Sequence, residues 1–97
     1  MPDFYDRLAD LLSDPQYTPD GSELPTKDSA VKAAVILEWM ADHNIHPDRI
    51  VASAEGGIAL CWFRGNKYAD VECLNTGEVL CVISDRKNKP IVWMVEL

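Results

Sequence analysis

The chain has 97 residues, 16 acids against 9 bases, a formal net charge of −7 and a hydrophobic share of 47%. This is enough for one globular domain, residues 1–97, and the hydrophobic share excludes a disordered chain. The charge disfavours nonspecific binding to nucleic acid or an anionic membrane, and no segment approaches the roughly 18 consecutive apolar residues of a membrane span.

Cysteine usage favours a cytoplasmic protein, and the uneven charge favours a partner with a basic surface. Residues 1–50 carry ten acids against four bases, whereas residues 51–97 carry six against five. The start MPDFYDRL has no basic segment followed by an apolar core, so we expect no signal peptide. The three cysteines form no C-x-x-C pair and fit reduced, buried thiols.

The first expected element is a short amphipathic helix over residues 3–13. Its apolar stripe consists of Phe4, Leu8, Leu11 and Leu12, and its acidic stripe of Asp3, Asp6, Asp10 and Asp14. Residues 15–25 follow with three prolines and a glycine, so we expect no regular structure there and a loop that wraps the surface.

A second helix is expected from Thr26, its N-cap, to about Asn44. Spacing at 100° per residue gives it a broad apolar face of Ala30, Ala33, Ile36, Leu37, Met40 and Ala41. It also gives a narrower apolar stripe of Val31, Val35 and Trp39. One face should cover the sheet, and the first helix is the nearest cover for the other. We therefore expect this helix to be sandwiched between the first helix and the sheet.

Strands are expected at Ile50 to Ala54, 57–63, 67–74, 78–84 and 90–96. Gly65-Asn66 predicts a two-residue hairpin that pairs Arg64 with Lys67, and Asn75-Thr76-Gly77 predicts a three-residue turn that pairs Leu74 with Glu78. Both turns place the same residues on one face: Ile58, Leu60, Trp62, Ala69, Val71, Cys73, Val79, Cys81 and Ile83. The fold class is α+β, with two N-terminal helices packed on a five-stranded, mainly antiparallel meander sheet.

The other face of this sheet is unusually apolar for a solvent face. It carries Ala59, Cys61, Phe63, Tyr68, Asp70, Glu72, Leu80 and Val82. The last strand adds either Ile91, Trp93 and Val95 or Val92 and Met94. An exposed patch of this kind suggests an interface with another protein or with a second copy, unless the first helix or the long loop covers it.

Three other groups of residues are weaker indications of a functional site. Asp6, Asp10 and Asp14 could complement a basic partner or simply form a solvated helix face. His43 and His46 could serve a metal site between subunits, but histidines at a helix end are the commoner reading. Glu55-Gly56-Gly57 precedes a strand rather than a helix, which excludes a phosphate loop.

No catalytic arrangement is evident, because no nucleophile and base share a predicted face. We therefore expect no enzyme activity, no cofactor and no resident metal.

The hairpin motif also resembles a known group of sequences. The motif comprises GGIALCW (Gly56 to Trp62), Gly65, Val71-Glu72 and Gly77-Glu78-Val79. It is similar to small, uncharacterised bacterial and phage α+β proteins with a Gly-Gly-apolar-x-Leu-x-Trp strand. These often carry an acid before the tryptophan, where this chain has Cys61. The resemblance, over residues 56–79, implies a microbial origin and the same sheet, and assigns no activity or functional residue.

The sequence thus predicts a small acidic protein that binds another protein without catalysis, as an antitoxin or a phage-encoded inhibitor does. The expected contact residues are Phe63, Tyr68, Leu80 and Val82 on the second sheet face and Asp6, Asp10 and Asp14 on the first helix. The partner would have a basic surface or be a second copy. The alternatives are a small-ligand or metal-binding domain with a site between subunits, or a structural homodimeric subunit of a larger assembly.

Overall fold

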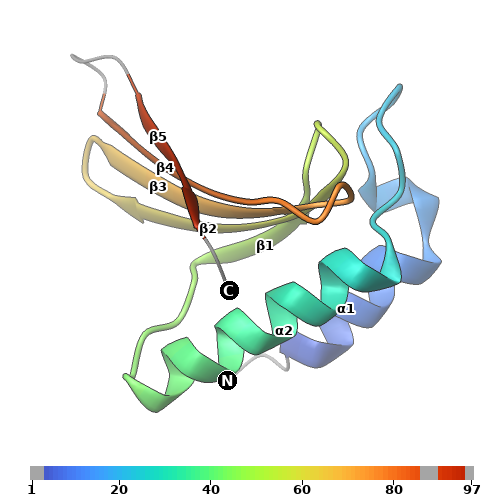
Figure 1. Cartoon of the computed structure of the whole chain (residues 1–97), viewed down its shortest axis with the longest axis horizontal. Coiled ribbons are helices and arrows are strands. Elements are labelled where there is room, and N and C mark those ends of the chain that lie inside the picture. Colours follow the sequence, from blue (N-terminus) through green and yellow to red (C-terminus); the bar gives the residue numbers. More distant parts are fainter. Residues whose placement is uncertain (1–3, 86–89, 96–97) are drawn as a thin grey trace.

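The computed structural model describes residues 4–85 and 90–95 and shows two helices on one face of a five-stranded sheet (Figure 1). The helical part comprises α1 (Phe4–Ser13), the 3-10 turn η1 (Pro15–Tyr17) and α2 (Lys27–Asp42). The strands are β1 (Arg49–Ala52), β2 (Gly57–Arg64), β3 (Lys67–Leu74), β4 (Val79–Asp85) and β5 (Ile91–Val95). They lie in the order β1-β2-β3-β4-β5, and every neighbouring pair is antiparallel. The expected α+β meander is confirmed.

The predicted register of the central strands is confirmed. Arg64 pairs with Lys67 across the first hairpin, and Leu74 N donates to Glu78 O at 2.8 Å across the second turn. The pairs further along both ladders follow from these two turns without a bulge. The two turns therefore assign the residues of β2, β3 and β4 to opposite faces of the sheet, as the sequence indicated.

The structure also settles which face of the last strand points to the helices. Val95 pairs with Val79, and Trp93 pairs with Cys81. Because paired residues share a face, the alternating set that includes Trp93 and Val95 lies on the helical face, and Val92 and Met94 lie on the second face.

Helix α2 forms as its sequence predicts at the start and ends slightly earlier. Thr26 is the N-cap, and its hydroxyl accepts a hydrogen bond from Ser29 N at 3.2 Å. The helix ends at Asp42, and Asn44 takes a left-handed conformation with φ of 58° that a continuing helix would not allow.

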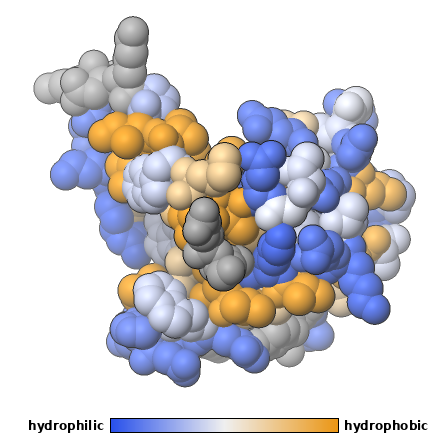
Figure 2. Space-filling model, viewed as in Figure 1, coloured by the Kyte–Doolittle hydropathy of each residue, from blue (hydrophilic) through white to orange (hydrophobic). Residues whose placement is uncertain are grey.

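The expected sandwich of α2 between α1 and the sheet is wrong. Val31 and Val35 are each 52% exposed, and Trp39 is 58% exposed. Helix α1 lies beside α2 and packs against β1, where Arg7 Nε donates to Ile50 O at 3.0 Å. The physical reason is that α2 covers β2 and β3 but not β1, so the apolar stripe of α1 is buried against that uncovered edge. Figure 2 shows the hydrophobic surface left open between the helices and the sheet.

The long loop is tied to the turn end of the sheet. Ser22 Oγ donates to Ala54 O at 2.8 Å, and Asn75 bonds both Leu24 O at 2.9 Å and Thr26 N at 2.8 Å. The loop therefore wraps the surface as expected. The prediction of no regular structure is wrong at Pro15–Tyr17, because proline is well suited to the first position of a helical turn.

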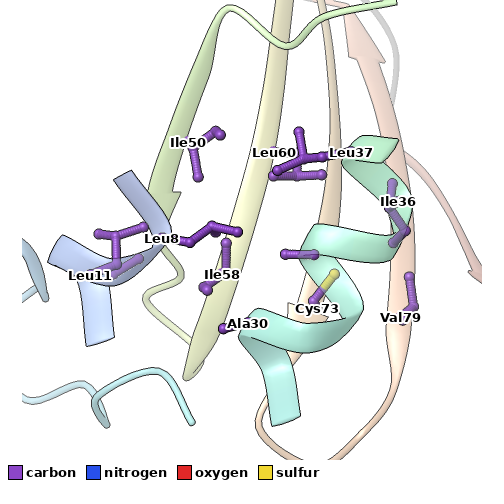
Figure 3. Packing of buried hydrophobic residues seen from close by; sticks show 12 residues of the cluster. Leu8, Leu11, Ala30, Ile36, Leu37, Ile50, Ile58, Leu60, Cys73 and Val79 are labelled. Atoms are coloured by element: carbon purple, nitrogen blue, oxygen red, sulfur yellow. The ribbon is translucent and has the colours of Figure 1, made fainter. Parts of the chain in front are cut away.

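The core lies between the two helices and one half of the sheet (Figure 3). Its buried side chains are Leu8, Leu11, Ala30, Ala33, Ile36, Leu37, Ile50, Ala52, Ile58, Leu60, Cys73 and Val79. By contrast Ile83, expected on the same core face, is 47% exposed. The helices thus bury the part of the sheet near β1, β2 and β3 and leave the inner face toward β5 uncovered.

We expect Gly57→Ala to lower the free energy of unfolding by about 3 kcal/mol. The backbone at Gly57 has φ of 129°, and a Cβ there would lie 2.2 Å from the carbonyl oxygen of Cys73 on the neighbouring strand. Urea denaturation followed by circular dichroism measures the loss. Gly65→Ala is the matched control, because its φ is 64° and no atom lies within 4 Å, so we expect a loss of about 1 kcal/mol. Equal losses would contradict the packing argument.

Candidate protein-binding surface

An apolar wedge lies between α2 and the strands β4 and β5 (Figure 2). At its closed end is a cavity of about 260 Å³. The side chains around this cavity are all apolar or cysteine: Ile36, Trp39, Met40, Val71, Val79, Cys81 and Val95. The apolar lining of the wedge therefore interacts weakly with water, and an apolar side chain would bind there favourably.

The two walls of the wedge come from different parts of the chain. One wall is α2, where Trp39 lines the cavity; Val31 and Val35 lie with Trp39 on the side of α2 turned away from the sheet, and we call these three residues the helix stripe. The other wall is the uncovered inner face of β4 and β5, which we call the sheet strip: Cys81, Ile83, Ile91 and Trp93. All but Cys81, which is half-buried, expose 43–64% of their surface.

The sheet strip is uncovered because the helical layer is too narrow. Across the inner face α1 lies against β1 and α2 against β2 and β3, and among residues 4–85 and 90–95 no helix covers the end of β4 and β5 that carries Ile83 and Ile91. Neighbouring strands are about 4.8 Å apart, so two strands present a strip roughly 10 Å wide. That is about the diameter of one helix.

Strand β5 adds an apolar edge beside the wedge. Val92 and Met94, on the second face, are 56% and 62% exposed, so this strand is apolar and exposed on both sides. Its sequence IVWMV contains no charge and no proline. Edge strands of soluble proteins usually carry such protective residues, and their absence here is typical of a strand that another chain covers.

The contact residues predicted on the second sheet face lie there together, and both helices lie on the other side (Figure 1). Phe63 is exposed and its ring contacts that of Tyr68 at a centroid distance of 5.2 Å. Leu80 and Val82 are half-buried. The Tyr68 hydroxyl, however, points along the face and donates to a carboxylate oxygen of Asp70.

Two carboxylates occupy the middle of this second face. Asp70 is only 8% exposed; one of its oxygens bonds Tyr68 and the other has no hydrogen-bond partner. Burial raises the pKa of Asp70 and of Glu72, although hydrogen bonds from Tyr68 and from Ser53 Oγ partly oppose this. Burial also raises the pKa of Tyr68 far above its usual value. A partner covering this face would have to desolvate both acids further, which is costly.

The predicted acidic stripe lies at the opposite edge of the molecule from the wedge. Asp6 and Asp10 are exposed on α1, which packs against β1. Asp14 has a structural role as the cap of η1, where it accepts hydrogen bonds from Gln16 N at 3.1 Å and Gln16 Nε2 at 2.8 Å. Asp3 lies outside the described residues. The predicted contact residues thus fall on two separate surfaces.

The chemistry of the remaining titratable groups is local. His43 Nδ1 lies 2.9 Å from Trp39 O, and its ring is 4.7 Å from the indole, so this histidine is tied to the end of α2. Burial raises the pKa of the Cys73 thiol to about 11, which makes it a poor nucleophile at neutral pH. In the part of the chain that the structure describes, no three His, Cys, Asp or Glu side chains are grouped to hold a metal ion.

Comparison with protein-family models, with curated proteins and with solved structures gives no match. None of the helices in the described ranges is long and apolar enough to cross a membrane. The arguments about function therefore rest on the geometry of this chain.

Sequence reasoning identified the helix stripe but not the wedge. The stripe is apparent at helical spacing, but the spacing does not show that the first helix leaves it exposed. The apolar character of both faces of IVWMV is also apparent, but it does not show that both faces are left exposed.

We expect Asp70→Asn to remove part of the pH dependence of stability. Because the folded pKa of Asp70 is raised above 3.8, the folded state binds the proton more tightly than the unfolded chain. The contribution of this proton to the free energy of unfolding is fully present below the unfolded pKa and is lost as the pH rises through the folded pKa. The stability of the variant relative to the wild type should therefore grow as the pH rises from about 4 to 8. Urea titrations across this range measure it.

Asp48→Asn serves as the control with the opposite sign. The hydrogen bond from Phe63 N, and then Arg64, lower the pKa of Asp48, so its contribution is present above the unfolded pKa and is lost as the pH falls through the folded pKa. A pH-independent difference between Asp70→Asn and the wild type would show that Asp70 titrates normally.

Proposed function

We propose that this protein is a non-enzymatic domain that binds another protein chain through the wedge and the adjoining edge of β5. One observation carries the proposal. Large apolar side chains gather around α2, β4 and β5 with 43–64% of their surfaces exposed: Val31, Val35, Trp39, Ile83, Ile91, Val92, Trp93 and Met94. Six of them, all but Val92 and Met94 of the second face, lie on the helical side of the sheet and present roughly 600 Å² at on the order of 100 Å² each, the upper end of the range for the largest apolar patch of a typical monomer.

The shape of the surface favours a protein over a small molecule. The cavity of about 260 Å³ continues into an open wedge instead of closing around a ligand. Sites for drug-sized ligands have about 300–1,000 Å³ and bury most of the ligand. A cavity of this size suits one large apolar side chain of a partner, with the rest of that partner lying along the wedge.

The charge distribution bears on a partner only at long range. The exposed Asp6 and Asp10 lie at the edge of the molecule opposite the wedge, so they would attract a basic partner during its approach and would not contact it in the wedge. A small acidic protein that covers a surface of its target acts as an antitoxin or a phage-encoded inhibitor does, and we propose a role of this kind. The second sheet face around Phe63 would then be a minor contact, because its buried carboxylates resist further desolvation.

The test is capture from the native lysate with a tagged chain, compared across surface variants. We expect the wild type to retain a stoichiometric partner, and Trp39→Ser or Trp93→Ser to reduce the retained amount at least about tenfold, since aromatic anchors dominate binding energy. Quantitative mass spectrometry measures the retained amounts.

Two controls decide which surface binds. Leu24→Ser changes an exposed apolar residue on the loop and should leave capture unchanged, as should Phe63→Ser on the second sheet face. If Phe63→Ser abolishes capture while Trp39→Ser does not, the binding surface is the second face and the proposal is wrong.

A further inference from the structure

We infer that the chain bound in the wedge is a second copy of this protein, in a twofold dimer where α2 of each copy lies against β4 and β5 of the other. This inference rests on the proposed function and names its partner. In such a dimer α2 has its own sheet on one side and the partner's sheet on the other. The layers then run sheet, two helices, sheet.

The first argument is that α2 has two apolar sides. Its buried residues Ala33, Ile36 and Leu37 face its own sheet. At 100° per residue, Val35 lies roughly 150° around the helix from the centre of that buried side. A helix that is apolar on nearly opposite sides is typical of one packed between two layers, and the monomer supplies only one.

The second argument is that each copy offers what the other lacks. Every copy has one helix stripe without a sheet over it and one sheet strip without a helix over it. The stripe from Val31 to Trp39 is about 12 Å long at the helical rise. On the sheet, the strip residues Ile91 and Trp93 continue along the same face to Val95, which lines the cavity; this stretch is about 14 Å long at the strand rise and about one helix wide.

Twofold symmetry follows from this pairing. The stripe of the first copy contacts the strip of the second, and the strip of the first contacts the stripe of the second. Both contacts form in the same dimer, so neither the stripe nor the strip is left to recruit a third copy. The assembly closes, which fits a discrete dimer and not a filament.

The area is sufficient for a stable dimer. The exposed residues of the stripe and strip are Val31, Val35, Trp39, Ile83, Ile91 and Trp93, which contribute roughly 600 Å² of apolar surface per copy at on the order of 100 Å² each. Stable interfaces bury roughly 800 Å² per partner, with about two-thirds of the core area apolar. Roughly 600 Å² is therefore in the range of the apolar part of such an interface.

A dimer through the edge of β5 alone is a poorer solution. It would extend the sheet, but it would leave the helix stripe exposed to water.

The charges also agree with the crossed arrangement, because α1 with Asp6 and Asp10 lies at the sheet edge opposite the wedge. Each copy still carries −7, so salt should strengthen self-association by screening, whereas it would weaken binding of a basic partner.

The experiment is sedimentation equilibrium of the full chain with two charge variants, one in each wall. Val35→Glu places a charge on the helix stripe, and Ile83→Lys places one on the sheet strip. Both residues are about half exposed, so the fold should tolerate the changes, and far-ultraviolet circular dichroism checks this. We expect the wild type to be a dimer and each variant alone to dissociate at least about tenfold more readily.

Mixing the two variants gives the decisive readout. In the mixed dimer the glutamate of one copy meets the lysine of the other, and the second contact is fully wild type. We therefore expect a one-to-one heterodimer to reappear. Leu24→Glu, an exposed loop position away from the wedge, should dimerise like the wild type.

Three outcomes would overturn the inference. If Val35→Glu alone remains fully dimeric, the dimer forms through the β5 edge or the second face. If the mixture stays monomeric while both variants are folded, the stripe and strip do not meet. If the wild type is monomeric but a lysate protein is captured through Trp39, the dimer is wrong and the proposed function stands; without capture, both fail.

Discussion

A helix is about as wide as two strands of a sheet, and this constraint underlies the whole arrangement. Five strands need more cover than two helices give, and α1 lies against the single edge strand β1. The uncovered area therefore falls on β4 and β5, next to the outer side of α2. The core, the wedge and the exposed stripe of α2 all result from where these two helices lie.

The sequence predicts the local part of this structure well and the long-range part poorly. The turns at Gly65 and Gly77 fix pairing between neighbouring residues, so register and faces follow from short-range rules, as does the cap at Thr26. The position of α1 is different, because its apolar stripe could be buried equally well against α2 or against β1. Only the relative stability of these two packings decides where α1 lies, and the hydrophobic pattern of the sequence carries no information about it. The wedge was missed for the same reason.

The two faces of the sheet differ in what it would cost to cover them. On the second face, Asp70 and Glu72 are already partly desolvated, with raised pKa values, and Asp70 has a buried oxygen without a partner. Further burial would require these acids to be neutralised or paired. The inner face of β4 and β5 is apolar apart from the half-buried Cys81 and Asp85 at the far end of β4. Hydrophobic burial is favourable there without any such penalty, so the sheet itself directs association to its helical side.

Association through the wedge would also explain the composition of α2. A helix on the surface of a monomer needs one apolar side, and a second one exposes hydrophobic area that favours aggregation. Here the second apolar side faces away from the sheet, and the uncovered strip of sheet next to α2 is about as wide as a helix. Neither surface is self-complementary by itself, whereas the pair is complementary to its own copy turned by a half rotation. The exposed stripe of α2 and the uncovered strip of sheet have no cover in the isolated chain, and in the dimer they cover each other and form a closed, three-layered unit.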